Sequence, residues 1–146
     1  MSEDDQEAMI EFTRLHGNMI QIIGDDFLVT NSNMVEKAVK QNACNAVLIK
    51  VNQVGTVSEA VDTFNTARKS SWGTVVSARS GETEDVSISH LATGLGSGQL
   101  KVGPFQRSER MVKWNECLRI QDELGADAFV GGAPLAKTWW YRQKSK

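Results

Sequence analysis

Residues 46–79 read AVLIKVNQVGTVSEAVDTFNTARKSSWGTVVSAR, and this stretch decides the fold. It begins and ends with short apolar runs, 46–49 and 73–76, each of the length and composition of a buried strand. Between them Thr56 and Glu59 form a capping box, which opens a helix with one apolar stripe. Strands joined by a crossover helix lie parallel, so the stretch predicts a βαβ unit.

The same alternation continues on both sides of this unit. We expect a helix from Ala8 ended by Gly17, a strand at 19–23, helices at 33–40, 84–94 and 108–124, and a brief strand at 99–101. The last helix is expected to carry Met111, Trp114 and Leu118 on one apolar face and to end at Gly125. The prediction is an α/β fold in which residues 1–125 form one helix and four parallel βα units, with residues 126–146 as a C-terminal tail. Four strands amount to half of an eight-stranded barrel.

Composition limits the classes of function. The chain has 146 residues, 40% of them hydrophobic, and a formal charge of −2. That charge argues against broad binding to nucleic acid or to an anionic membrane surface. The longest apolar runs fall well short of the roughly 20 residues that span a bilayer, so we expect a cytoplasmic protein.

Charged residues stand where each predicted strand gives way to its loop. They are Asp25, Lys50, Arg79 and Lys101, separated by 25, 29 and 22 residues. In a parallel barrel such positions meet at the carboxyl ends of the strands. Charges there are costly unless they are used, so the set suggests a site for an anion and a metal. The alternative is that these side chains simply pair with one another.

Four motifs carry a resemblance to a known family. They are GDDFLVTN at 24–31, LIKVNQVG at 48–55, SARSGETED at 77–85 and GQLKVG at 98–103. Their order and spacing strongly resemble the enolase family, phosphopyruvate hydratase. The resemblance extends from about Ser2 to Gly125 and includes RSER at 107–110. It implies that the four βα units form the C-terminal half of an enolase-type TIM barrel.

The resemblance implies a role for each strand-end residue. Asp25 matches the last of three carboxylates that hold Mg²⁺, and Lys50 matches the base that removes the C2 proton of 2-phosphoglycerate. Arg79 and Ser80 match the phosphate-binding pair, and Lys101 matches the lysine at the substrate carboxylate. The implied reaction is the reversible, magnesium-dependent dehydration of 2-phosphoglycerate to phosphoenolpyruvate in glycolysis.

The implied chemistry is physically consistent with these residue types. Removing a proton next to a carboxylate creates a doubly charged enediolate, which cations must stabilise. Sites of this superfamily generally pair a Lys or His base with magnesium. A lysine serves as a base only when its pKa is lowered, and we expect Lys101 and a metal to do this for Lys50. The planar guanidinium of Arg79 suits a phosphate.

Two departures from the family lower the expected activity. The family has His where this chain has Ala78, just before the phosphate-binding Arg. The family's N-terminal domain, its other two metal carboxylates and its acid Glu correspond to positions before residue 1. We therefore expect little or no activity from the chain by itself.

Other interpretations remain open. The chain could be a non-catalytic, enolase-derived binding or assembly module that pairs with itself, as a homo-oligomer, or with a complementary N-terminal half. A third interpretation, an acid-sugar or muconate-type relative, is disfavoured by Arg79, Ser80 and Lys101. Two smaller expectations are that Asp26 hydrogen-bonds within its loop, and that the acidic residues at 82–85 favour a helix N-terminus.

Overall fold

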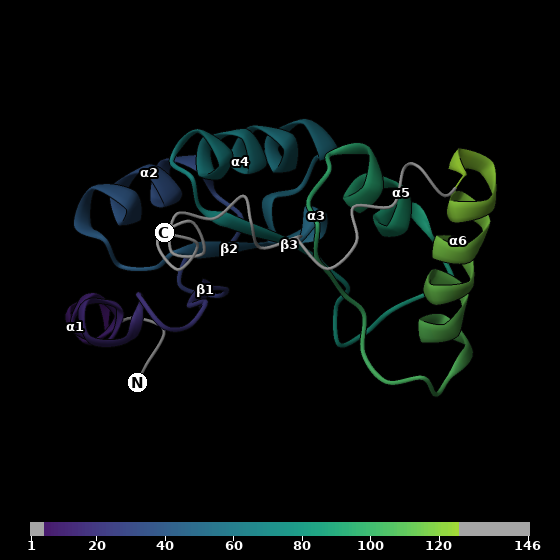
Figure 1. Ribbon diagram of the computed structural model, residues 1–146, viewed down its shortest axis with the longest axis horizontal. Coiled ribbons are helices and arrows are strands. Elements are labelled where there is room, and N and C mark those ends of the chain that lie inside the picture. The colour runs from purple at the N-terminus through teal and green to yellow at the C-terminus, as the bar shows by residue number, and fades with distance from the viewer. Residues whose placement is uncertain (1–4, 126–146) are drawn as a thin grey trace. The chain divides into compact units, whose positions relative to one another are not determined.

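Helices and strands alternate along the chain in the computed structural model, which describes residues 5–125 (Figure 1). The elements are α1 (Gln6–His16), β1 (Ile23–Gly24), α2 (Ser32–Gln41), β2 (Ala46–Ile49), α3 (Val51–Val54), α4 (Val57–Lys69), β3 (Gly73–Ser77), α5 (Ser87–Gly94), β4 (Leu100–Lys101) and α6 (Ser108–Leu124). The sheet has the order β1-β2-β3-β4, and β1 pairs with β2, and β3 with β4, in parallel. The predicted α/β fold with parallel strands is confirmed. The predicted tail at 126–146 lies outside the described residues.

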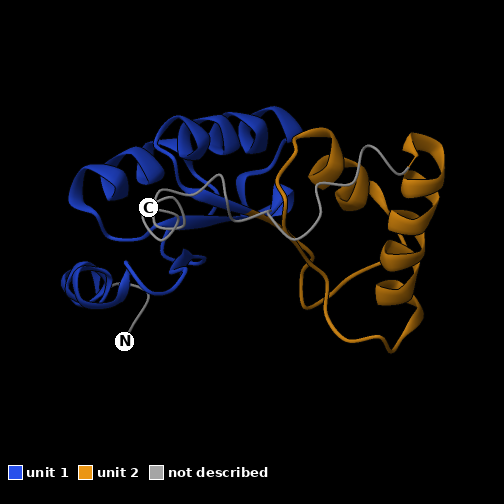
Figure 2. Cartoon of the chain, in the orientation of Figure 1, with its two compact units in different colours: residues 1–74, 135–146 blue, residues 75–134 orange. Residues whose placement is uncertain are grey.

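The chain divides into two compact units, coloured separately in Figure 2. Within the described residues, unit 1 comprises 5–74 and unit 2 comprises 75–125. Unit 1 holds α1 to α4 with β1 and β2, and unit 2 holds α5, β4 and α6. The division falls inside β3, between Thr74 and Val75. Each unit is described below by itself.

Unit 1 is built around β2. All four residues of this strand are buried, as the apolar run at 46–49 predicts. Helix α4 packs on β2, and α2 packs against α4 (Figure 1). The side chains of Leu28, Val35 and Phe64 lie in the core between these elements and the neighbouring loop. Apolar burial of this kind contributes roughly 2 kcal/mol for each large side chain.

The first strand is much shorter than predicted. Met19 and Ile20 were expected in it, but they are 57% and 46% exposed, and β1 begins only at Ile23. The reason is Asn45, whose buried side chain takes over hydrogen bonds that a strand would make. Its Nδ2 donates to the carbonyls of Gly17 at 3.1 Å and Ile20 at 2.9 Å, and its Oδ1 accepts from Ile22 N–H at 2.6 Å.

In unit 2, α5 packs against α6, and the end of β3 pairs with β4. The apolar face predicted for α6 is confirmed only in part, because Met111 and Trp114 are half-buried whereas Leu118 is exposed. The residues of this helix that are buried are Arg110, Lys113 and Ile120, whereas Leu118 is 61% exposed. The two cations can be buried because backbone carbonyls and the carboxylates of Glu82 and Glu109 surround them.

Two helix boundaries also differ from the prediction. The one-turn helix α3 was not expected; it follows β2 directly and ends at Gly55, whose φ is 112°. Helix α5 begins at Ser87 rather than near Glu84. None of the helices within residues 5–125 is long and apolar enough to cross a membrane.

Candidate active site

Asp25 and Lys50 meet at the carboxyl ends of two paired strands in unit 1. Asp25 follows β1, and Lys50 follows β2, in a register that pairs Gly24 with Val47. Lys50 Nζ donates to Asp25 Oδ1 in a close ion pair. The Lys50 side chain is 10% exposed and that of Asp25 is 35% exposed, so the pair is open to solvent on the acid's side. The structure thus brings together two of the residues singled out from the sequence.

Thr30 fixes the backbone beside Lys50. Its hydroxyl accepts from Lys50 N–H at 3.0 Å and donates to the Leu48 carbonyl at 3.2 Å. Its own carbonyl accepts from the Thr63 hydroxyl of α4 at 2.8 Å. Thr30 is fully buried with a φ of 55°, an uncommon conformation that these bonds hold in place. Sequence reasoning missed this residue, because a threonine in a motif gives no sign of the bonds it makes.

The loop after β1 is tied to α3 and to the core. Gln53 Nε2 donates to Asp26 Oδ1 at 2.8 Å, so Asp26 is a hydrogen-bonding partner within the loops, as expected. Leu28 anchors the same loop in the core with 0% exposure. A Cβ at Gly24 would lie 2.3 Å from Leu28 Cδ1, so only glycine allows the anchor to close over the strand end.

Unit 2 presents the other predicted residues. Arg79 is half-buried and Ser80 exposed in the loop after β3, and the exposed Lys101 ends β4. Ala78 N–H donates to the Lys101 carbonyl at 2.8 Å, which continues the pairing of Ser77 with Lys101. The loop and Lys101 therefore occupy the carboxyl ends of neighbouring strands. The meeting of all four charged positions at one mouth stays a prediction.

Glu82 and Lys113 form an ion pair behind this loop. Lys113 Nζ lies 2.9 Å from Glu82 Oε2 and donates to the Thr83 carbonyl at 2.8 Å and the Glu109 carbonyl at 2.9 Å. Glu82 Oε1 accepts from Arg79 N–H at 2.7 Å. Burial alone would raise the pKa of Glu82, but the Arg79 N–H, the Lys113 ammonium and the charge of Arg110 together hold that pKa below its ordinary value.

This arrangement corrects the expected role of the acidic residues at 82–85. Glu82 serves the loop and α6 rather than the N-terminus of α5. Asp85 does serve that terminus, because its Oδ1 accepts from Ser87 N–H at 2.9 Å. Hydrogen bonds from Ser87 lower the pKa of Asp85.

Arg110 of α6 binds both loops that carry the predicted substrate contacts. Its Nη1 donates to the carbonyls of Arg79 at 2.8 Å and Val102 at 2.9 Å, and its Nη2 donates to the Ser80 carbonyl at 2.9 Å. Arg110 is 7% exposed. Sequence reasoning missed it as a functional residue, although the RSER motif at 107–110 contained it.

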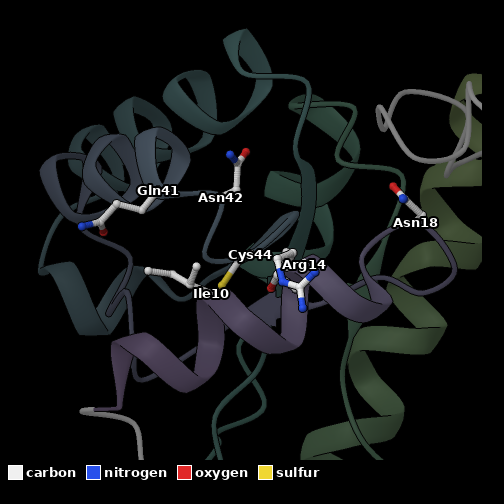
Figure 3. A pocket seen from close by; sticks show the side chains of 7 residues that line it. Ile10, Arg14, Asn18, Gln41, Asn42 and Cys44 are labelled. Carbon is white, nitrogen blue, oxygen red and sulfur yellow. The ribbon is translucent and has the colours of Figure 1, made fainter.

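A cavity of about 340 Å³ also lies in unit 1, and neither Asp25 nor Lys50 is among its lining residues (Figure 3). It is lined by Ile10, Thr13, Arg14, Asn18, Gln41, Asn42 and Cys44. Arg14 is engaged with Glu11, and the Thr13 hydroxyl donates to the Ala43 carbonyl at 2.8 Å. Burial raises the pKa of Cys44 to about 12, so its thiol stays protonated. The residues that line this cavity therefore do not suggest a catalytic site.

A bound Mg²⁺ requires several oxygen ligands, with carboxylates among them. Within residues 5–125, no group of three or more His, Cys, Asp and Glu side chains is placed to hold a metal ion. Asp25 contributes one carboxylate, and that carboxylate is bonded to Lys50. The described residues alone therefore do not fit a magnesium site.

Parallel βα units with charged side chains at the carboxyl ends of their strands define a segment of a TIM-barrel domain. Residues 1–138 match a family model described as the C-terminal TIM barrel domain of enolase. The chain belongs to the enolase family.

Individual enolases agree with this assignment. The chain is 50% identical over 131 residues to enolase 2 of Hevea brasiliensis, which covers 90% of this chain and 29% of that protein. It is 47% identical over 135 residues to the enolase of Solanum lycopersicum, and 51% identical over 134 residues to that of Mastigamoeba balamuthi. Each of these two matches covers 92% of this chain and 30% of the relative. The chain thus spans about 30% of the length of these relatives.

Proposed function

We propose that this chain supplies part of an enolase active site, which dehydrates 2-phosphoglycerate reversibly to phosphoenolpyruvate in the glycolysis of the cytoplasm. One observation carries the proposal: the Asp25 and Lys50 pair stands at the carboxyl ends of β1 and β2 in a chain of the enolase family. In barrels of this kind, that is where catalytic residues lie.

Lys50 is the proposed base for the C2 proton. A base must offer a free lone pair, and Lys50 Nζ is engaged with Asp25. The ion pair therefore has to open, and the Lys50 ammonium has to lose a proton to solvent, before Nζ can accept the C2 proton. Thr30 keeps the Lys50 backbone in place while the side chain moves, because its bonds are to main-chain groups.

Arg79 and Ser80 are the proposed phosphate contacts, and Lys101 the contact for the substrate carboxylate. A guanidinium offers paired N–H donors that match two phosphate oxygens, and a hydroxyl adds another donor. The exposure of Ser80 and Lys101 leaves both side chains accessible to a ligand. Fixed cations of this kind stabilise charge that develops during the reaction.

Magnesium dependence is proposed from the family alone. Asp25 is the proposed ligand, and the described residues do not complete a metal site around it. We therefore infer that the chain has little or no activity by itself. Ala78, in the position of the family's His, is expected to weaken substrate binding further.

An assay of phosphoenolpyruvate absorbance tests these roles. The purified chain is mixed with 2-phosphoglycerate and Mg²⁺, alone and together with the complementary part of a relative's enolase. We expect turnover only in the mixture, and a loss of at least about a hundredfold when Lys50 is changed to Met. Lys40→Met, at an exposed position of α2, is the matched control.

Strong turnover by the chain alone would overturn the proposed inactivity. Full activity of Lys50→Met in the mixture would overturn the role of Lys50. Binding of 2-phosphoglycerate to the chain, followed by NMR, tests Arg79, Ser80 and Lys101 without turnover: Arg79→Met should abolish the shifts.

A second candidate function is that of a non-catalytic assembly module. Apolar side chains are exposed from the end of α1 to the start of β1, an edge strand of the described sheet: Leu15 by 52%, Met19 by 57%, Ile20 by 46% and Ile23 by 38%. Exposed apolar surface next to an open strand edge favours a protein partner. A complementary N-terminal half or a second copy would suit it. Light scattering that finds a well-behaved monomer in isolation would count against self-association.

A further inference from the structure

We propose that Arg110 is a positioning residue for the phosphate loop, which we define as residues 79–81. The inference rests on the proposed phosphate contacts of Arg79 and Ser80 and adds a residue outside the loop that shapes them. Arg110 lies on α6, about thirty positions further along the chain, and is buried.

Within the described residues, the side-chain hydrogen bonds of Arg110 go to the backbone of two loops, and its Nε also lies 4.0 Å from Glu109 Oε1 on the same helix. The carbonyls of Arg79 and Ser80 belong to the phosphate loop, and the carbonyl of Val102 follows Lys101 directly. One guanidinium therefore fixes the phosphate loop and the strand end that carries the proposed carboxylate contact. Hydrogen bonds from a charged donor are roughly twice as strong as neutral ones.

Peptide geometry gives these bonds a consequence for ligand binding. The described chain contains no cis peptide bonds, so each N–H points opposite to the carbonyl of its own peptide group. The carbonyls of Arg79 and Ser80 point to Arg110. The N–H groups of Ser80 and Gly81 therefore point away from it. Within residues 5–125, neither N–H has a hydrogen-bond acceptor. Arg110 thus turns two backbone donors outward, as an anion requires.

The surroundings are shaped for a guanidinium. Gly103 has a φ of 130°, and a Cβ there would lie 3.3 Å from Arg110 Cδ. Lysine could not reproduce the contacts, because an ammonium is a point charge without the planar fork that reaches three carbonyls. Lys113 binds the far end of the same segment through Glu82 and the Thr83 carbonyl. Lys113 donates to the carbonyls of Thr83 and Glu109, whereas Arg110 donates to those of Arg79 and Ser80.

The experiment uses the full chain and inorganic phosphate as the probe. Amide shifts of Ser80 and Gly81 are followed by NMR during a phosphate titration, in wild type, Arg110→Lys, Arg110→Met and the control Arg119→Met. Arg119 lies on the same helix with a 64% exposed side chain paired to Glu116. Hydrogen exchange is measured in parallel at the N–H groups of Ala78 and Arg79, which bond to the Lys101 carbonyl and to Glu82.

We expect phosphate to shift the Ser80 and Gly81 amides of wild type and of Arg119→Met with equal affinity. In Arg110→Lys the affinity should fall by about tenfold while unit 1 exchanges as in wild type. Arg110→Met should lose more, and exchange at Ala78 and Arg79 should quicken in both Arg110 variants. If Arg110→Met does not fold, Arg110→Lys, which keeps the charge, decides the matter.

Wild-type phosphate affinity and exchange in Arg110→Lys would overturn the inference. So would a loss of binding that merely follows the loss of folded protein. If wild type itself shows no shift with phosphate, the proposed phosphate contact fails. The exchange rates then decide separately whether Arg110 holds the loop: quickened exchange supports that role, and unchanged rates overturn it.

Discussion

The two units support charged strand-end residues in different ways. In unit 1 the loop that carries Asp25 is anchored by Leu28, an apolar side chain in an apolar core. In unit 2 the loop that carries Arg79 is anchored by Arg110 and Lys113, two buried cations. A loop can therefore be held in place either by burial of an apolar side chain or by hydrogen bonds from buried cations to its carbonyls.

The largest effect should come from removing a buried cation in unit 2. Lys113→Met leaves Glu82 and two carbonyls without their partner, and we expect unit 2 to lose about 4 kcal/mol of unfolding free energy. Urea unfolding with hydrogen exchange, read separately for 5–74 and 75–125, measures this. Arg119→Met, which removes only an exposed pair, should cost under about 0.5 kcal/mol. Equal small losses in both variants would erase the contrast between the units.

The apolar anchor of unit 1 should come next. Leu28→Ala opens a cavity at a fully buried site, and we expect a loss of about 3 kcal/mol. Exchange within 25–31 should quicken in the same measurement, since this loop closes over Leu28. The control Leu15→Ala, at a side chain exposed by 52%, should change little. A similar loss at both leucines would show that burial does not govern unit 1.

Asn45 is one of the buried polar side chains of unit 1, so it tests how far hydrogen bonds add to apolar burial there. Asn45→Leu keeps the size but leaves Ile22 N–H and two carbonyls unpaired, and we expect a loss of about 2 kcal/mol. Thermal unfolding by circular dichroism checks the loss. A neutral or stabilising result would mean that the segment before β1 can rearrange to bond elsewhere.

The smallest effect should be the dependence on pH that Glu82 gives to unit 2. The pKa of Glu82 is below its ordinary value of 4.5 in the folded chain, so the unfolded chain binds the proton more readily. The stabilisation is complete above 4.5 and is lost as pH falls through the lower, folded value. Glu82→Gln should flatten the acid limb of the stability of unit 2. If the loss of stability at acid pH is the same in Glu82→Gln, other carboxylates cause that loss.

The parts of the fold that sequence predicts best are those held by apolar burial. The run at 46–49 gave β2 in full, and the capping box at Thr56 gave the start of α4. The sequence also predicted that Asp25 and Lys50 lie side by side, because both follow strands that pair in parallel and such strands end at the same edge of the sheet.

The parts that sequence predicted poorly depend on hydrogen bonds between distant residues. The apolar face assigned to α6 was only partly right, because hydrophobicity does not show that Lys113 is buried against Thr83 and Glu82. The strand expected at 19–23 was too long because the Asn45 side chain hydrogen-bonds the backbone of this segment at Gly17, Ile20 and Ile22. Asn45 is 28 positions from Gly17, so the sequence pattern does not show these bonds. Thr30 was missed for the same reason, since its bonds reach β2, the residue after that strand, and helices α3 and α4.

The bonds of Arg110 also bear on how such a barrel can be cut and recombined. The loop after β3 is supported by α6, which follows the next strand rather than its own. A single βα unit is therefore not an exchangeable part here. In a chimera joined between β4 and α6, the loop after β3 and Arg110 come from different parents. The parent that supplies α6 must then provide an arginine that reaches this loop. Without it, we expect the loop to lose its shape even if both parent proteins fold. A junction between α4 and β3 should be better tolerated, because it leaves Arg110 and the three carbonyls that it binds in the same parent segment.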